Sequence, residues 1–342
     1  MNLETTCVDT HSHFYPSGML IELEAGRSWH GWTAVAGPDG SRLMRCDAGT
    51  VAWPSAKGAK SWEERITDRR VQEHVDVDAT MVPAYMFGYD MPVAEAIAYC
   101  REVNDELADL ERRSAGRVVG LGVLPLQDPE ATEAELERAV KDLGLRGFGI
   151  GTNVEGANFD EPWIVRSLEA IVDADAAIMM HPNWFGKPAQ DRLKRYYFGN
   201  SFGVPLEAGL AVMSIAYSGL LDRKPEARIG VTHGGGWVAY GIGRLLLRTS
   251  QGLDTGATME EPADVYLRRF YYDCLIHDEL SLELLVRRVG ADKLMIGTDY
   301  PYQGDMPGGS VNWIRGMGTL STREKEMILG GNAHRFLKLG GR

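Results

Sequence analysis

The stretch CVDTHSHFYP, residues 7–16, places two histidines one residue apart at the end of the first predicted strand, residues 6–13. Residues i and i+2 of a strand point to the same side, so the imidazoles of His11 and His13 can converge on one point. An open dinucleotide-binding sheet would carry a glycine-rich phosphate-binding turn at this position. The two histidines stand there instead, which favours a different α/β architecture.

Seven further apolar runs, rich in β-branched residues and followed by turn residues, predict the remaining strands. They span residues 79–85, 118–125, 147–153, 176–182, 228–235, 270–276 and 294–301. Helical patterns separate them, for example over 93–113 and 128–144. Eight strands that alternate with helices predict an α/β fold of the (β/α)8 TIM-barrel type, with residues 1–342 as a single domain.

Residues 14–70 interrupt this alternation. The stretch is rich in Gly, Trp and Arg and contains GPDGS at 37–41, a typical turn sequence. We interpret it as an insertion after the first strand, a small β-hairpin flap over the C-terminal mouth of the barrel. Active sites of barrel enzymes lie at that end.

The composition excludes several classes of partner and location. A net charge of −12 disfavours nucleic acid, and it means that a small anionic substrate needs local arginines or a metal ion to bind. The four cysteines form no CxxC pair. Neither a signal peptide nor an apolar run long enough to cross a membrane is present, so we expect a cytoplasmic protein.

Three more polar residues stand at predicted strand ends: His181 in MMHPNW, His233 in VTHGGGW and Asp299 in IGTDYPY. Each has an ordinary explanation, as a core histidine, a glycine turn or a capping aspartate. Their coincidence with the histidine pair at the ends of different strands favours a metal site instead. Nitrogen and oxygen ligands of this kind suit zinc or a similar divalent ion.

The motifs DTHSHFYP, VVGLGVLPLQDPE, MMHP, HGGGWVAYGIGR and DKLMIGTDYPY, in this order and spacing, resemble the decarboxylase branch of the amidohydrolase superfamily. The resemblance implies one divalent ion per chain, zinc or alternatively manganese, with the metal ligands His11, His13, His181 and Asp299. It also implies that His233 is the acid/base catalyst beside the metal, so His233 and Asp299 are the candidate catalytic residues.

The same resemblance implies a homodimer in which Arg244 reaches the site of the neighbouring subunit and binds a substrate carboxylate. A flap arginine, Arg45 or alternatively Arg42, would contact the substrate as well. Trp184 and Tyr302 are the other candidate substrate-binding residues. The family's HPW is HPNW here, so the loop that carries Trp184 departs from the family pattern.

These residues predict a metal-dependent non-oxidative decarboxylase of an unsaturated or aromatic carboxylic acid. The same mononuclear site could instead activate water, which would give a hydrolase of an amide, lactone or C–C bond, or a hydratase. A non-catalytic barrel that keeps its metal for stability is a third interpretation. Fold and ligands alone do not separate these functions.

Overall fold

Eight parallel strands form the central sheet of the described chain, and they are ordered in the sheet as in the sequence. They are β1 (Val8–His13), β5 (Val77–Met81), β6 (Val118–Gly122), β7 (Gly147–Ile150), β8 (Ala177–Met180), β9 (Ile229–Val231), β10 (Tyr271–Asp273) and β11 (Leu294–Met295). The structure, a computed structural model, describes residues 6–55, 58, 60–185, 190–251, 256–302, 306 and 308–340.

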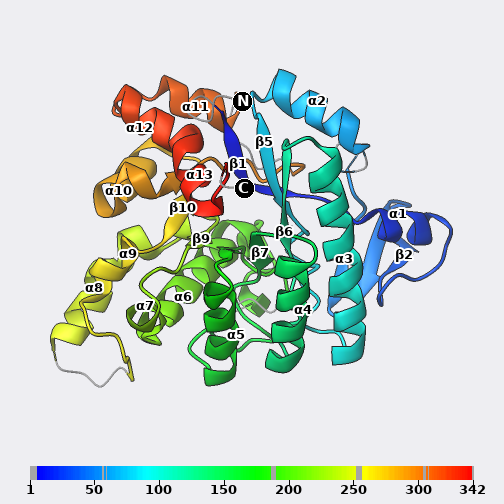
Figure 1. Cartoon of the computed structure of the whole chain (residues 1–342), viewed down its shortest axis with the longest axis horizontal. Coiled ribbons are helices and arrows are strands. Elements are labelled where there is room, and N and C mark those ends of the chain that lie inside the picture. The colour runs from blue at the N-terminus through cyan, green and yellow to red at the C-terminus, as the bar shows by residue number, and fades with distance from the viewer. Residues whose placement is uncertain are drawn as a thin grey trace.

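The first and last strands of the sheet meet and close it. Asp9 and Ile296 form a parallel bridge, and the Thr10 N–H donates to the Ile296 carbonyl at 2.9 Å. A sheet that closes in this way is a barrel. The (β/α)8 barrel predicted from the sequence is therefore confirmed, with its helices around the strands (Figure 1).

Helices cover the outer surface of the barrel. The longer ones are α3 (Val93–Arg113), α4 (Pro129–Lys141), α5 (Pro162–Asp173), α6 (Val204–Tyr217), α8 (Val238–Ser250) and α10 (Glu279–Val289). The shorter ones are α7 (Leu220–Arg223), α9 (Ala263–Leu267), α11 (Ser310–Gly316), α12 (Thr322–Glu326) and α13 (Asn332–Leu337). All residues of β1, β5, β6, β7, β8 and β9 are buried, as expected for parallel strands that are covered on both faces.

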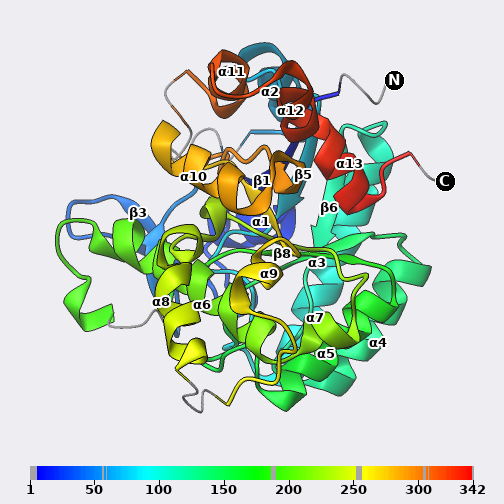
Figure 2. The same ribbon diagram turned by 90° about the vertical axis from the view of Figure 1, so that its left-hand side faces the viewer.

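Residues 14–70 contain more than a hairpin. Helix α1 (Ser17–Glu24) precedes a three-stranded antiparallel sheet of β2 (Thr33–Ala36), β3 (Arg42–Cys46) and β4 (Gly49–Ala52). The β2–β3 turn lies at 37–41, where GPDGS predicts it, and Gly37 N–H donates to the Ser41 carbonyl. The final element, α2 (Trp62–Gln72), continues past residue 70 and leads into β5. In Figure 2, β3 lies on the opposite side of the molecule from α13.

The strands are shorter than the sequence pattern predicts. The run over 79–85 forms a strand only as far as Met81, and the run over 147–153 only as far as Ile150. After Met81, Val82 and Pro83 are apolar buried loop residues, which carry the same hydrophobic signal as a strand. Among the described helices, none combines the length and apolar character that a membrane span requires.

Candidate metal centre and active site

The four predicted metal ligands meet at the C-terminal end of the barrel. His11 and His13 end β1, His181 directly follows β8, and Asp299 follows β11. One ligand atom from each lies within 4.8 Å of every other. Asp299 Oδ1 is 3.2 Å from His11 Nε2, 3.0 Å from His13 Nε2 and 4.0 Å from His181 Nε2. The structure thus brings together the predicted ligand set.

Each of the three histidines uses its Nδ1 atom for a hydrogen bond on the outer side of the site. His11 Nδ1 lies 2.6 Å from Asp273 Oδ2, His13 Nδ1 lies 3.0 Å from the Val82 carbonyl, and His181 Nδ1 lies 2.9 Å from the Pro182 carbonyl. Because these acceptors require a protonated Nδ1, each imidazole in its neutral form carries its lone pair on Nε2, which faces the centre.

Two observations test whether a divalent ion fits this cluster. Ligand atoms around a tetrahedral ion with bonds of about 2.0 to 2.1 Å are separated by roughly 3.3 Å, in the range of the distances seen here. In addition, His11 Nε2 is buried and has no hydrogen-bond partner of suitable direction among the described residues, although Asp299 is near. The ligand set fits a metal ion.

The pKa values of the ligand residues depend on burial and on two carboxylates. Burial lowers the pKa of His13 and His181. Burial also lowers the pKa of His11, but Asp299 and Asp273 outweigh it and raise that pKa to about 10. The histidines in turn hold the pKa of Asp299 well below its usual value, against the effect of burial. A metal ion that binds would therefore displace a proton from His11.

His233 lies beside the ligands, as predicted. Its Nε2 is 3.4 Å from His181 Nε2, and its ring centroid is 4.8 Å from that of His11. Burial, with a smaller contribution from His11, lowers the pKa of His233 to about 4.

The backbone around His233 is left-handed, with φ of 54° at His233 and between 59° and 67° at the three glycines that follow. Residue 236 must also be glycine for steric reasons, because a Cβ there would lie 2.0 Å from the Pro205 carbonyl oxygen. Asp299 has a φ of 58° too. Unfavourable backbone conformations of this kind concentrate at functional sites.

Asp273 is a site residue that the sequence analysis missed. It ends β10, is fully buried, and accepts hydrogen bonds from His11 Nδ1 and from the Gly234 N–H at 2.8 Å. Gly297 allows this approach, since a Cβ at that position would lie 2.6 Å from Asp273 Oδ2. The available signal was a single aspartate within the apolar run FYYDCLI, because a buried carboxylate needs a partner.

Two buried arginines of α2 hold the strand that carries the histidine pair. Arg65 donates to Asp78 Oδ2 at 2.9 Å and to the His13 carbonyl at 2.5 Å. Arg69 pairs with Asp9, whose other oxygen accepts the His11 N–H at 2.9 Å. Thus α2, at the end of the inserted stretch, positions the backbone of both ligands.

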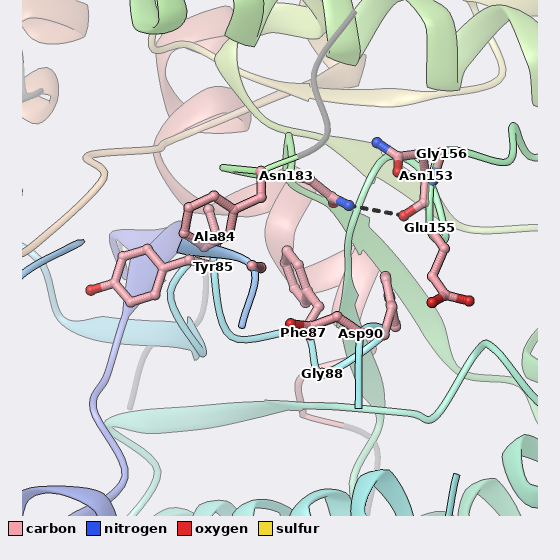
Figure 3. A pocket seen from close by; sticks show the side chains of 12 residues that line it. Ala84, Tyr85, Phe87, Gly88, Asp90, Asn153, Glu155, Gly156 and Asn183 are labelled. Atoms are coloured by element: carbon pink, nitrogen blue, oxygen red, sulfur yellow. Dashed lines mark hydrogen bonds between the residues drawn. The ribbon is translucent and has the colours of Figure 1, made fainter. Parts of the chain in front are cut away.

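The additional asparagine of HPNW has a structural role. Asn183 Oδ1 accepts the Thr152 N–H at 2.9 Å, and its Nδ2 donates to the Asn153 carbonyl at 3.0 Å, the bond drawn in Figure 3. Thr152 and Asn153 both donate to the buried Glu207 carboxylate. Asn183 therefore ties the loop after β8 to the loop after β7.

Three tyrosine hydroxyls form a cluster next to the ligands. Tyr15 Oη lies 3.0 Å from both Tyr85 Oη and Tyr302 Oη, and the latter two are 3.2 Å apart. The Tyr302 ring packs edge-on against His13, with centroids 5.4 Å apart. Burial raises the pKa of all three. Of this trio the sequence analysis named only Tyr302, although Tyr15 continues the alternation of His11 and His13.

A cavity of about 370 Å³ lies behind one member of this cluster. The loops after β5, β7 and β8 line it, with the Tyr85, Phe87 and Phe185 rings and the Asp90 and Glu155 carboxylates. In Figure 3 the Tyr85 ring forms one wall while its hydroxyl points away from the Phe87 and Asp90 side. The Tyr85 ring thus separates the cavity from the tyrosine hydroxyls.

The structure places the other predicted substrate-binding residues outside the ligand cluster. Trp184 is 37% exposed in the loop after β8, and Arg45 is exposed on β3. Arg244 is exposed on α8 and forms no ion pair with any described residue. Their roles in substrate binding stay predictions.

Comparison with known proteins agrees with this site. The amidohydrolase family model matches residues 8–339. The 2-amino-3-carboxymuconate-6-semialdehyde decarboxylase of Dictyostelium discoideum is 34% identical over 341 residues, which cover 97% of this chain and 91% of that protein.

Solved structures show the same fold. The 5-carboxyvanillate decarboxylase of Sphingomonas paucimobilis has a TM-score of 0.80 at 22% identity and covers 98% of this chain and 99% of its own. A dihydroxybenzoic acid decarboxylase from Polaromonas sp. JS666, solved with manganese, has a TM-score of 0.77 at 20% identity and covers 99% and 98%. From the family match, the 34% identical relative and the ligand set, this chain belongs to the amidohydrolase family.

Proposed function

We propose that the protein is a metal-dependent non-oxidative decarboxylase of an unsaturated or aromatic carboxylic acid. The observation that carries this proposal is the position of His233, whose Nε2 lies 3.4 Å from the ligand atom of His181. An acid/base group beside a mononuclear site is what the reaction needs. The similarity to a named decarboxylase over 97% of the chain supports the same reaction type.

The difficulty of the reaction is that loss of CO2 from an sp² carbon leaves an electron pair without an acceptor. The negative charge of a bound substrate carboxylate raises the pKa of His233 and favours its protonated form. Protonated His233 then donates a proton from Nε2 to the carbon that bears the carboxylate, which becomes sp³. The bond to the carboxylate then breaks, its electron pair returns to the conjugated system, and CO2 leaves. His233 regains its proton from solvent.

His11, His13, His181 and Asp299 would hold a divalent ion, which would supply Lewis-acid stabilisation of developing negative charge. We propose zinc as this ion, since three imidazoles and one carboxylate suit it. Manganese is the alternative, and a structural neighbour contains it. Asp299 would contribute to catalysis as a metal ligand whose carboxylate lies between the histidine ligands. Asp273 maintains the orientation of His11.

We also propose a homodimer in which Arg244 serves the neighbouring site. Arg244 lies on α8 four residues after Tyr240 and three before Leu247, which places the three side chains on one helix face. Tyr240 is 81% and Leu247 52% exposed. The adjoining α6 adds exposed Leu206 and Leu210. An exposed apolar face around an unpaired arginine fits a second copy of the chain.

We propose that the flap, residues 14–70, lies over the barrel mouth. Arg45 rather than Arg42 contacts the substrate in this arrangement. Arg42 is engaged elsewhere, because its guanidinium stacks 3.5 Å above the Trp53 ring and donates to the Leu23 carbonyl. The β3–β4 turn approaches the loop after β8, since a Cβ at Gly49 would lie 2.5 Å from the Phe185 ring.

The test combines metal analysis with a reaction assay. Metal content is measured by plasma mass spectrometry, and CO2 release is followed for a panel of conjugated and aromatic acids. About one ion per chain together with CO2 release is the expected result. One ion per chain with no CO2 from any acid would overturn the proposal and favour the hydrolase or hydratase, which incorporation of labelled water would then identify.

A further inference from the structure

The cavity of about 370 Å³ behind the Tyr85 ring has no part in the proposed reaction. Its volume is in the range of small-molecule sites. None of the four metal ligands lines it, and neither does His233. The loops after β5, β7 and β8 form its walls, and the β3–β4 turn contributes Ala48. The cavity is therefore a second place, apart from the metal centre, where a small molecule can bind.

Aromatic rings form much of the cavity wall. Phe87 and Tyr89 are buried, and their rings stack with centroids 5.9 Å apart and an interplanar angle of 17°. Tyr85 and the Phe185 ring of the loop after β8 are half-buried. In Figure 3, Tyr85 and Glu155 lie at opposite ends of the group of lining residues, with Phe87 between them. Aromatic rings carry partial negative charge on their faces and attract cations there.

Two carboxylates line the same cavity without a described counter-ion. Asp90, in the loop after β5, and Glu155, in the loop after β7, are exposed, and neither forms an ion pair with a described residue. The described lining residues include no Lys, Arg or His. The net charge of −12 adds a general attraction for cations. The cavity thus combines negative charge with aromatic surface, and both favour a positively charged ligand.

A hydrogen-bond donor in the wall has no acceptor. The Tyr89 hydroxyl accepts the Gly151 N–H at 3.0 Å, and its own proton has no acceptor among the described residues. Burial raises the pKa of Tyr89, so the hydroxyl keeps this proton. A buried donor that lacks an acceptor is unfavourable. Because Tyr89 lines the cavity, an oxygen atom of a bound ligand can accept this proton.

We propose that this cavity binds a small organic ammonium ion that also carries an oxygen acceptor, such as an alkylated amino alcohol. Asp90 and Glu155 balance the positive charge, and the aromatic rings contact the alkylated nitrogen. Carboxylates alone would also attract a hydrated metal ion, whereas the aromatic walls favour an alkylated ammonium group. The site lies apart from the metal centre, and the inference does not rest on the proposed function.

The test compares two probes that differ in charge and have nearly the same shape. They are choline and 3,3-dimethylbutanol, in which a carbon replaces the charged nitrogen. Each is titrated into the zinc-loaded protein at constant ionic strength, and ligand-observed NMR gives the dissociation constants. We expect choline to bind about tenfold more tightly than the neutral alcohol, the effect of a partly desolvated cation–π contact.

Substitutions in the cavity wall locate the bound probe. Asp90→Asn and Glu155→Gln should each lower the choline-to-alcohol affinity ratio by about threefold. Phe185→Leu, which keeps an apolar contact but removes the aromatic face, should lower the ratio as well. Tyr89→Phe should instead weaken both probes by about fivefold and leave the ratio unchanged, because both probes carry the hydroxyl that accepts from Tyr89.

Asp264→Asn is the matched control. Asp264 is exposed on α9, outside the cavity lining, and its substitution changes the net charge as Asp90→Asn does. Equal affinity of the wild-type protein for the two probes, or no binding of choline, would overturn the inference. A ratio that stays unchanged in Asp90→Asn, Glu155→Gln and Phe185→Leu would also overturn it. The same holds for a ratio that falls in Asp264→Asn as much as in Asp90→Asn, because the effect would then come from general surface charge.

Discussion

Asp273 connects the metal ligand His11 to the turn that carries His233. One carboxylate oxygen accepts from His11 Nδ1 at 2.6 Å, and the other accepts from the Gly234 N–H at 2.8 Å. A single buried side chain on β10 thus sets the orientation of a ligand and the position of the candidate acid.

Replacement of Asp273 by Asn should lower metal affinity by about 10- to 100-fold, as loss of outer hydrogen-bond partners does at other metal sites. The amide keeps the size of the carboxylate but removes the charge that stabilises the Nδ1–H of His11. Competition with a chromophoric chelator measures the affinity. Asp278→Asn, at the exposed N-cap of α10, is the control. An affinity equal to that of the wild type would show that Asp273 is only structural.

His233→Asn should retain the metal ion and lose activity by about 10²- to 10⁴-fold, the usual contribution of a general acid or base. Asparagine is preferred to alanine for this test because residue 233 has a φ of 54°, which asparagine tolerates better. Metal analysis and CO2 release are measured on the same sample. By comparison, Asp299→Ala should lose metal occupancy. Full activity in His233→Asn would exclude the proposed proton donor.

Removal of the metal by a chelator should inactivate the protein and lower its melting temperature. An ion present at about 1,000 times its Kd adds roughly 4 kcal/mol to the free energy of unfolding. Zinc or manganese, added back separately, should restore melting temperature, and the activity of each form identifies the working ion. Asp299→Ala serves as the control, since a chelator should no longer shift its melting curve. Activity that survives complete metal removal would contradict the proposed site.

The sequence predicted the ligands because they occupy places with geometric meaning. His11 and His13 share one side of a strand, and His181, His233 and Asp299 follow strands that end at the same face of the barrel. The His11–Asp273 and Tyr15–Tyr85 contacts were not predicted, because their residues lie 262 and 70 positions apart in the chain, respectively. Strand ends were predicted too late where buried loop residues continue the apolar pattern, as after Met81.

The arginines of α2 offer a test of how the histidine pair is supported. Arg65→Met should lower the free energy of unfolding by about 3 kcal/mol, because it leaves the buried Asp78 carboxylate without its main partner. Urea unfolding measures the change. Combination with Asp78→Asn should recover part of the loss, while Arg112→Met, at a position whose side chain is 73% exposed, should change little. A decrease in the free energy of unfolding of less than about 1 kcal/mol would show that the Arg65–Asp78 ion pair does not support the histidine pair.

The proposed contribution of Arg244 to a neighbouring site can be tested by mixing two inactive variants. In a dimer of His233→Asn with Arg244→Ala, one site combines an intact His233 with the Arg244 of the other subunit, and the second site lacks both. Random exchange makes half of the dimers mixed, so activity should return to about a quarter of the wild-type value. The measurement is CO2 release after the two variants are unfolded together and refolded, with each variant treated alone as the control. If Arg244 serves its own subunit, every site in the mixture still lacks one residue, and no activity returns.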